Sequence, residues 1–309
     1  MSTSNADKPI FIVGAARSGT TLLQFMLRSH PHVSLPTAES HFFIPFYAAR
    51  DEYGDLTERD NLRRLISDIY EKKQLFFKAD FHGMTFDVEA VTDMLHREQC
   101  SNVPDIISRI FQENAKGEGK VRWGDKTPYY VLHMDTLLAM FPGAQFVHLI
   151  RDGRDCALSM LERKHDLKIF NTYHAAYTWN KYVVSGRAFG ERHPDRYFEV
   201  RYEDILDNPQ DSIQALCEFL EIEFSQDVIE FRKAKEGLKT PLLRQPLQRS
   251  NQNKWKSKMS EKQIEIFENM AGETLEACGY DLASSSPSIS AINRLYYELE
   301  IKWNHYRDR

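Results

Sequence analysis

Short runs of apolar residues recur along the chain, and longer stretches between them place apolar residues three or four positions apart. Short β-branched and aromatic runs bounded by turn residues are typical of strands that are buried on both faces. We therefore expect strands over residues 10–13, 33–35, 121–126, 144–150 and 197–202.

The stretches between these runs have the spacing of amphipathic helices. We expect helices over residues 20–29, 129–140, 172–190, 264–278 and 289–306, and a mostly helical insert over 51–117. Strands that alternate with helices favour an α/β fold with a parallel sheet. We expect a single domain over 1–283, and a linker with an amphipathic helix over 284–309.

The first apolar run leads into a turn that has the features of an anion-binding site. Gly14 and Gly19 bracket the turn, and the helix that follows begins near Thr20. Backbone N–H groups and the positive end of the helix dipole converge at such a turn. The spacing is that of a P-loop, but Thr20 stands where a P-loop has its lysine, and Arg17 is the only fixed positive charge in the turn. We expect a P-loop-type three-layer fold, with a central parallel sheet of about five strands flanked by helices.

Other candidate residues come just after the predicted strands. In parallel α/β sheets these strand ends meet at one edge, where sites form. Glu39 and His41 follow the second strand, Lys126 ends the third, and Arg151 follows the fourth. Ser159 and Arg163 lie on the next helix, four residues apart on one face, where they could clamp a second anion with Arg151. Helix capping by Glu39 and ion pairing among Arg151, Asp152, Arg154 and Asp155 are the structural alternatives, and we expect ion pairing for Arg154 at least.

Composition narrows the classes of function. A net charge of −5 gives no overall basic footprint for nucleic acid. The four cysteines form no C-x-x-C pair, which argues against a disulfide framework or a zinc site. We find no apolar signal region and no apolar run of the ~18–20 residues that a membrane helix needs. We expect a cytoplasmic protein that binds neither membranes nor nucleic acid. A basic stretch over 236–258 is expected to be a mobile loop.

The ordered set of motifs resembles the sulfotransferase family that uses 3′-phosphoadenosine 5′-phosphosulfate (PAPS). The resemblance is carried by Arg17-Ser18-Gly19-Thr20-Thr21, by Arg151 with Ser159 eight residues later, and by Trp123-Gly124-Asp125-Lys126-Thr127-Pro128. It continues through Arg201-Tyr202-Glu203-Asp204 and Asn253-Lys254-Trp255, and so spans about residues 8–282. Within that family the chain is most similar to the bacterial and tyrosylprotein-like branch.

The resemblance implies a role for each matching residue. The turn with Arg17, Ser18, Gly19, Thr20 and Thr21 would bind the 5′-phosphosulfate, and Arg151 with Ser159 the 3′-phosphate. Arg163, Tyr202, Lys254 and Trp255 would contact the nucleotide. Glu39 would be the general base, and Lys126 and Arg17 would stabilise the transferring group. His41 stands where the tyrosylprotein branch has an arginine, so the resemblance leaves open whether His41 shares the role of base. PAPS would be the co-substrate and its desulfated form, PAP, the product, with no metal required.

Two other functions stay open at this point. A P-loop kinase or ATPase would need Mg-ATP, which the missing loop lysine argues against. A non-catalytic scaffold could have kept the nucleotide site. The acceptor is expected to be a hydroxylated small molecule, sugar or peptide. The aromatic segment over 42–47 and the insert over 51–117 are expected to shape its pocket. Phe76, Phe77 and Phe81 could line such a pocket, but core packing is the safer assumption for them. The last helix could pair two chains into a homodimer.

Overall fold

The computed structural model describes residues 7–72, 84–231, 247, 251–285 and 287–307. Within these residues, five parallel strands form one sheet in the order β2-β3-β1-β4-β5. They are β1 (Ile10–Gly14), β2 (Val33–Ser34), β3 (Arg122–Lys126), β4 (Gln145–Ile150) and β5 (Tyr197–Arg201). The predicted α/β class and the parallel sheet of about five strands are confirmed.

The register of β1 with its two neighbours determines what surrounds the glycine turn. Ile12 of β1 lies opposite Lys126 of β3, and Gly14 lies opposite Leu149 of β4. Because the strands are parallel, the ends of β3 and β4 flank the turn that leaves β1. Lys126 therefore lies on one side of the turn, and Arg151 lies on the other.

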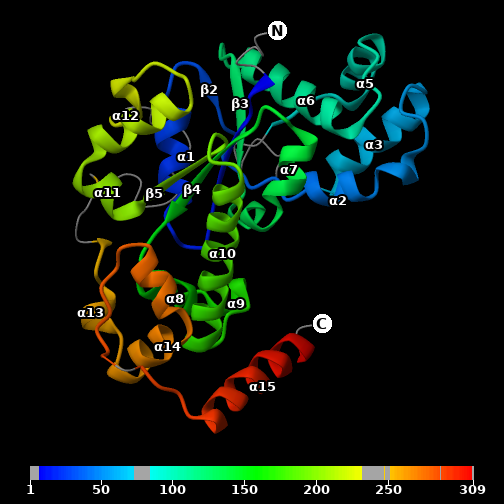
Figure 1. Ribbon diagram of the computed structural model, residues 1–309. Coiled ribbons are helices and arrows are strands. Elements are labelled where there is room, and N and C mark those ends of the chain that lie inside the picture. The colour runs from blue at the N-terminus through cyan, green and yellow to red at the C-terminus, as the bar shows by residue number, and fades with distance from the viewer. Residues whose placement is uncertain (1–6, 73–83, 232–246, 248–250, 286, 308–309) are drawn as a thin grey trace.

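Side chains on β1 alternate between two hydrophobic cores. Ile10 and Ile12 pack with Leu23 and with residues of α11 and α12, whereas Phe11 packs with residues of α2, α6 and α7. Figure 1 shows α1, α11 and α12 on one side of the sheet and α6 and α7 on the other. The helices are α1 (Thr20–Arg28), α2 (Phe43–Ala48), α6 (Val103–Gly117), α7 (Met134–Met140), α11 (Tyr202–Asp207) and α12 (Pro209–Phe219). This is the predicted three-layer arrangement.

The insert between β2 and β3 is mostly helical, as expected. Besides α2 and α6 it contains α3 (Arg59–Lys72), α5 (Val88–Arg97) and the 3₁₀ turn η2 (Arg50–Tyr53). Phe42, Phe43 and Phe46 are at most 5% exposed, because they pack in the core with Phe11, Phe111 and Trp123. These three rings therefore belong to the core, and the expectation that the segment over 42–47 shapes an acceptor pocket stays a prediction. Phe76, Phe77 and Phe81 lie outside the described residues.

The chain between β3 and β4 departs from the single helix expected over 129–140. The segment expected as one helix begins as the 3₁₀ helix η4 (Pro128–His133) and continues as α7. The Tyr130 N–H donates to the carbonyl of Thr127, three residues back, and the Tyr130 hydroxyl accepts from the N–H of Phe43. These contacts hold the first turn in the tighter 3₁₀ form.

A third core joins the elements after β4. It is formed by α8 (Gly153–Glu162), α10 (Thr172–Arg192), α13 (Trp255–Lys258) and α14 (Glu261–Ala277), with the short α9 (Lys164–Leu167) beside α8. A capping box of Ser260 and Gln263 opens α14, and Gly279 follows the helix with φ +77°. Most of the basic stretch 236–258 lies outside the described residues; its described end contains α13.

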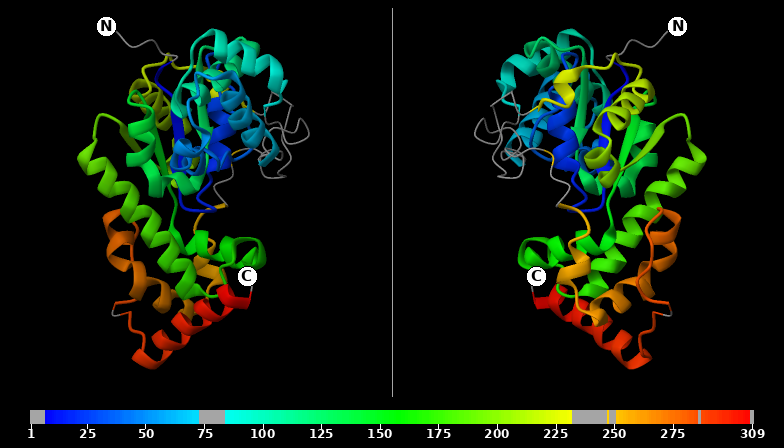
Figure 2. Two further views of the ribbon diagram at one scale, coloured as in Figure 1. Left: turned by 90° about the vertical axis from the view of Figure 1, so that its right-hand side faces the viewer. Right: turned by 90° about the vertical axis from the view of Figure 1, so that its left-hand side faces the viewer.

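The last helix, α15 (Ala291–Arg307), meets the rest of the chain near the start of α10 (Figure 2). Tyr297 stacks on Tyr173 with ring centroids 5.8 Å apart, and Asn171 donates to Glu300 at 2.9 Å. Its other face leaves Ile292 81% and Trp303 66% exposed. A separate C-terminal unit beyond residue 283, and a homodimer through this helix, stay predictions. Among the described helices, none combines the length and apolar character needed to cross a membrane.

Candidate active site

The turn from Gly14 to Thr20 is built around two glycines with unusual backbone angles. Gly14 has φ +154° and Gly19 has φ +98°. A Cβ on Gly14 would lie 2.5 Å from the carbonyl oxygen of Leu149, so the turn lies directly against β4. Gly19 is also the N-cap of α1 and has no side chain to occupy the N–H groups of the first helical turn. Those groups are left to bind an anion.

The interior of the turn contains a polar atom that lacks a partner. Ser18 is fully buried, and among the described residues its hydroxyl meets no hydrogen-bonding group. A buried hydroxyl is normally hydrogen-bonded, so an unpaired one marks the position of an absent ligand. Thr20 and Thr21 open α1 directly beside it. This unpaired hydroxyl is the structure's own sign that the turn fits an anionic group.

Arg17 extends out of the turn toward α8. Its backbone is left-handed, with φ 69°, and its Nε donates to the hydroxyl of Ser159 at 2.9 Å. The two anion clamps expected to be separate, Arg17 in the turn and Arg151 with Ser159, are therefore one continuous site. Burial lowers the pKa of Arg17, and the positive charges of Arg163 and Arg151 lower it further. A bound anion would relieve this repulsion between like charges.

Arg151 lies on the β4 side of the turn and is 9% exposed at its side chain. It donates to the carbonyl of Arg17 at 3.3 Å and to that of Asn251 at 2.6 Å, and it pairs with Asp155 at 3.5 Å. Within the described chain its Nε has no acceptor. The guanidinium has five N–H donors, so Arg151 is not saturated by these two hydrogen bonds.

Tyr202 joins the turn to the segment before α13. A Cβ on Gly19 would lie 2.5 Å from the Tyr202 ring, and the Arg151 guanidinium lies 4.7 Å from the centre of that ring. Asn251 donates to the Tyr202 hydroxyl at 2.6 Å and accepts from Lys254 at 2.5 Å. Tyr202 and Lys254, both predicted to contact nucleotide, therefore lie in one chain of contacts with Arg151. Asn251, which sequence reasoning missed, connects them.

Two other residues predicted to contact the nucleotide, Arg163 and Trp255, are engaged by neighbouring side chains. Arg163 follows α8, pairs with Asp166 at 3.0 Å and is 55% exposed at its side chain. Trp255 is buried, and the Arg154 guanidinium stacks 3.6 Å from its ring centre. The structure thus gives Trp255 a packing contact, and its contact with nucleotide stays a prediction.

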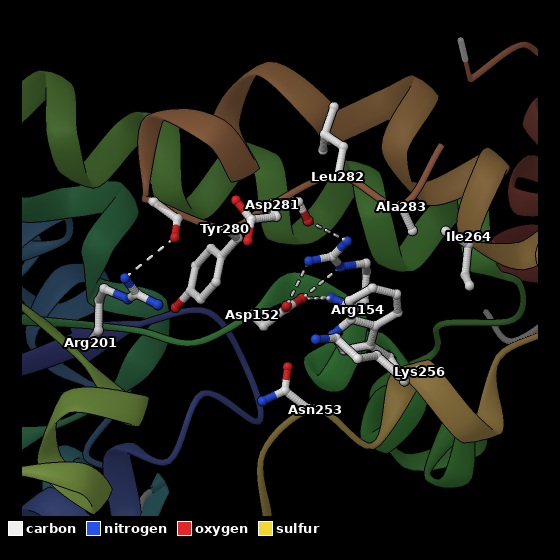
Figure 3. A pocket seen from close by; sticks show the side chains of 12 residues that line it. Asp152, Arg154, Arg201, Asn253, Lys256, Ile264, Tyr280, Asp281, Leu282 and Ala283 are labelled. Carbon is white, nitrogen blue, oxygen red and sulfur yellow. Dashed lines mark hydrogen bonds and ion pairs between the residues drawn. The ribbon is translucent and has the colours of Figure 1, made fainter. Parts of the chain in front are cut away.

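Trp255 and Arg154 also line a cavity of about 470 Å³ (Figure 3). Arg201 and Tyr280 lie toward one end of it, and Lys256 and Ile264 toward the other. Arg154 is paired with both Asp152 and Glu268, so its charge is already neutralised. The expected ion pairing of Arg154 is confirmed. Arg151 is also paired, with Asp155, but it lies in the cluster around the turn.

Glu39 lies on the other side of the turn, between the side chains of Lys126 and His41. Its carboxylate accepts from Lys126 Nζ at 2.6 Å and contacts His41 Nε2 at 3.0 Å. Lys126 is 4% exposed, whereas Glu39 is 38% and His41 46% exposed. Sequence analysis placed these three residues at one sheet edge, and the structure brings them into contact. Glu39 therefore pairs with Lys126 and faces solvent.

The charge of Glu39 is strongly stabilised. Burial opposes its ionisation, but the hydrogen bond from His41 and the charge and hydrogen bond of Lys126 outweigh burial and lower its pKa to about 2. Glu39 is therefore a carboxylate at any physiological pH. While Lys126 holds it, however, it binds a proton only weakly.

Two tyrosines that the sequence did not single out lie near this carboxylate. Tyr129 is 41% exposed, and its ring centre is 6.4 Å from that of His41. Burial raises the pKa of Tyr182 to about 12, with smaller contributions from Tyr129 and from the charge of Glu39. Both lie on helical segments where aromatic residues usually pack in the core, so no pattern distinguished them. They place aromatic surface beside the carboxylate.

The arrangement combines a turn shaped for an anion, an arginine cluster on one side and a lysine-held carboxylate on the other. Such a site can bind an anionic donor and accept a proton from an incoming group. Among the described residues, no group of three or more histidine, cysteine, aspartate or glutamate side chains could hold a metal ion.

Comparison with known proteins places this site in a family. Residues 9–226 match the family model described as "Sulfotransferase family". A putative protein-tyrosine sulfotransferase of Caenorhabditis briggsae is 23% identical, over 93% of this chain and 94% of that protein. Protein-tyrosine sulfotransferase 1 of Danio rerio is 26% identical, over 92% of this chain and 76% of that protein.

Solved structures have the same fold. The sulfotransferase domain of the Synechococcus PCC 7002 olefin synthase superposes with a TM-score of 0.59 at 21% identity, over 91% of this chain and 98% of that domain. The sulfotransferase domain from the curacin biosynthetic pathway gives a TM-score of 0.57 at 20% identity, over 89% of this chain and 98% of that domain.

Proposed function

The chain belongs to the sulfotransferase family, and we propose that it transfers the sulfuryl group of PAPS to a hydroxyl group of an acceptor. The observation that carries this proposal is the contact of Glu39 with Lys126 at 2.6 Å, at the sheet edge that also holds the arginine-lined glycine turn. A base and a cation placed beside an anion site are what transfer to a hydroxyl requires.

The residues of the turn and of α8 fit the two anionic ends of PAPS. The unpaired Ser18 hydroxyl, the first-turn N–H groups of α1 and the side chains of Thr20 and Thr21 would hold the 5′-phosphosulfate. Arg151 and Ser159 would hold the 3′-phosphate, and Arg17, which donates to Ser159, would bind the 5′-phosphosulfate from the turn. Tyr202, Lys254 and Arg163 would contact the rest of the nucleotide.

Glu39 would act as the general base. As the acceptor oxygen bonds to sulfur, the bond from sulfur to the bridging phosphate oxygen breaks, the hydroxyl proton passes to Glu39, and PAP leaves with the bridging oxygen. Lys126 would stabilise the charge that develops on that oxygen. By analogy with phosphoryl transfer, positioning and electrostatic stabilisation supply most of the catalysis.

The ion pair itself suggests how a carboxylate with a pKa of about 2 could serve as a base. Lys126 has one ammonium group, and without a donor it is bound to Glu39. A bound anionic donor would compete for this ammonium group and add negative charge beside Glu39. Both effects raise the pKa of the carboxylate, so the base would gain proton affinity only when the donor is in place.

We propose a hydroxylated small molecule, sugar or peptide as the acceptor. Tyr129 and His41, both partly exposed, and Tyr182 provide aromatic surface next to Glu39. Flat rings stack on such surfaces, so phenols are the first class to test. Two of the relatives are named protein-tyrosine sulfotransferases, which adds tyrosine peptides to the same set.

The test is transfer of ³⁵S from labelled PAPS to a panel of phenols, alcohols, sugars and tyrosine peptides. We expect at least one acceptor to be labelled, and we expect Glu39→Gln to lower kcat by about 10²- to 10⁴-fold, the usual contribution of a general base. The exposed Glu191→Gln should leave kcat unchanged. Full activity of Glu39→Gln would contradict the assignment of the base.

A thermal-shift comparison separates this function from that of a kinase or ATPase. Binding of PAP to the folded state should raise the melting temperature, whereas Mg-ATP at the same concentration should have a smaller effect. A larger shift with Mg-ATP would favour phosphoryl transfer instead.

A further inference from the structure

The contact between Glu39 and Lys126 is supported by residues on the opposite faces of the same two segments. Side chains along a strand alternate, so when Lys126 faces the site, its neighbours Asp125 and Thr127 face the other way. Asp125 is 1% exposed and Thr127 is fully buried. Ser40, the residue between Glu39 and His41, is likewise 1% exposed. Each half of the catalytic pair is thus next to a buried hydroxyl.

These buried groups bond directly across the gap between the two segments. The N–H of Ser40 donates to Thr127 Oγ1 at 3.0 Å, and the hydroxyl oxygens of Ser40 and Tyr130 are 2.9 Å apart. The Tyr130 hydroxyl also accepts from the N–H of Phe43 at 3.1 Å. The loop that carries Glu39 is therefore fixed at Ser40 and Phe43 to the strand end that carries Lys126.

We propose that Thr127, Ser40 and Tyr130 are positioning residues that hold Glu39 against Lys126; this inference rests on the proposed function. The carboxylate of Glu39 is 38% exposed, so its own surroundings only partly restrain it. His41 beside it has a left-handed backbone, with φ 53°, a conformation that persists only where neighbouring contacts enforce it. The buried hydroxyls supply those contacts.

The buried carboxyl group of Asp125 lies beside these hydroxyl groups. Thr127 Oγ1 accepts from the Ser40 N–H, which leaves its own hydrogen to point elsewhere. Within the described chain, neither Asp125 oxygen has a hydrogen bond of ordinary geometry, and the hydroxyls of Thr127 and Ser40 are near enough to affect it. Burial raises the pKa of Asp125 to about 6, and these two hydroxyls oppose the rise. Asp125 thus adds a buried carboxyl group beside the hydroxyls of Thr127 and Ser40, whose oxygens are 3.4 Å apart.

The experiment removes one of these hydroxyl groups and measures the pKa of Glu39. Carbon-13 labelling of glutamate carboxyl groups, with Glu39→Gln to assign the signal, gives the pKa of Glu39 by NMR titration without any acceptor. Thr127→Val keeps the shape of the side chain but removes Oγ1, whereas Thr127→Ser retains that oxygen. Ser40→Ala is the second test variant, and it replaces Thr127→Val if that variant does not fold. Thr92→Val is the control, because Thr92 is also fully buried and its hydroxyl donates to a helix carbonyl, in the insert.

We expect Thr127→Val, and likewise Ser40→Ala, to raise the pKa of Glu39 by about one unit or more toward its unperturbed value, because the carboxylate separates from Lys126. With an acceptor identified, kcat should fall at least about 10-fold with the KM for PAPS nearly unchanged, since only the chemical step needs this geometry. Thr127→Ser should restore both values, and Thr92→Val should change neither.

An unchanged Glu39 titration in Thr127→Val and Ser40→Ala would overturn the proposal, as would an equal shift in Thr92→Val. Failure of the proposed function looks different. If the wild-type protein sulfated no acceptor while the Glu39 titration still responded to Thr127→Val, the positioning network would stand and the reaction assigned to the site would fall.

Discussion

At the scale of single residues, the site concentrates backbone strain. Six described residues other than glycine have positive φ, and Arg17, His41 and Asn253 are three of them. Left-handed backbone costs a non-glycine residue about 1 kcal/mol or more. Arg17 lies in the turn, His41 lies beside the Glu39 carboxylate, and Asn253 lies in the segment before α13. Arg17 reaches Ser159 and His41 reaches Glu39 from these backbone conformations.

Arg151 carries the first prediction at this scale. Replacing it by alanine removes charged hydrogen bonds worth about 1.5–3 kcal/mol, so PAP should bind about 10- to 100-fold more weakly. Isothermal titration calorimetry with PAP measures this directly. Arg192→Ala is the control, because Arg192 lies on α10 in an exposed pair with Asp135. Equal affinity of Arg151→Ala and wild type would remove Arg151 from the nucleotide site.

The ion pair of Glu39 leads to a second prediction. Its pKa is about 2 in the structure, and saturation with PAP should raise it, because the phosphates compete for Lys126 and add negative charge. NMR titration of the labelled carboxyl group with and without PAP gives the shift. An unchanged or lower value with PAP bound would mean that the donor does not activate the base in this way.

At the scale of elements, the region where α8 begins contains two arginines with different surroundings, Arg151 and Arg154. Asp152 caps α8 and binds the Arg154 guanidinium at 2.8 Å, and Glu268 of α14 binds it at 2.6 Å. Trp255 of α13 stacks on the same group. Arg154 thereby joins three helices, whereas Arg151, three residues earlier, lies against the turn. Residue type alone does not distinguish the two arginines.

Arg154→Met should therefore destabilise the fold strongly. It leaves the two buried carboxylates of Asp152 and Glu268 without their cation, and breaking a buried pair in this way costs about 3–5 kcal/mol. Urea unfolding measures the loss. The exposed Arg192→Met should cost less than about 1 kcal/mol, as surface pairs do. Similar stabilities of the two variants would show that Arg154 does not join the helices.

At the scale of the whole molecule, two buried groups make stability depend on pH in opposite directions. Burial, with a smaller contribution from the charge of Arg187, lowers the pKa of His148 to about 3. Between about pH 6.5 and 3 the unfolded chain binds a proton that the folded chain excludes, so stability falls as the pH falls. Burial raises the pKa of Asp125 to about 6, so between about pH 4 and 6 the folded chain holds a proton that the unfolded chain has lost. The free energy of unfolding that Asp125 contributes therefore falls as the pH rises through this range.

The contribution of His148 is the larger of the two and can be isolated. Each proton that the unfolded chain binds and the folded chain excludes changes the free energy of unfolding by about 1.4 kcal/mol per pH unit. Urea unfolding between pH 6 and 4 should show a slope about that much steeper in the wild type than in His148→Gln. Equal slopes would mean that His148 accepts a proton without unfolding.

Much of this organisation could be predicted because it depends on local pattern. Apolar runs and helical spacing predicted the five strands and the insert, and strand ends predicted Glu39, Lys126 and Arg151 as site residues. The 3₁₀ form of η4 could not be predicted, since Tyr130 is held by contacts with Ser40 and Phe43, distant in sequence. The core role of Phe42 and Phe43 was missed for the same reason.

The sequence by itself determined the elements, the anion-binding turn and the residue types at the strand ends, because periodicity, glycine spacing and strand termination are local properties. Only the tertiary structure decided which of these residues meet. Strand order and register bring Arg17 to Ser159, and they bring Glu39 to Lys126 above a buried layer of hydroxyl groups. The physical reason is that a hydrogen bond depends on side-chain positions to within a few tenths of an ångström. That precision comes from packing between segments far apart in the chain.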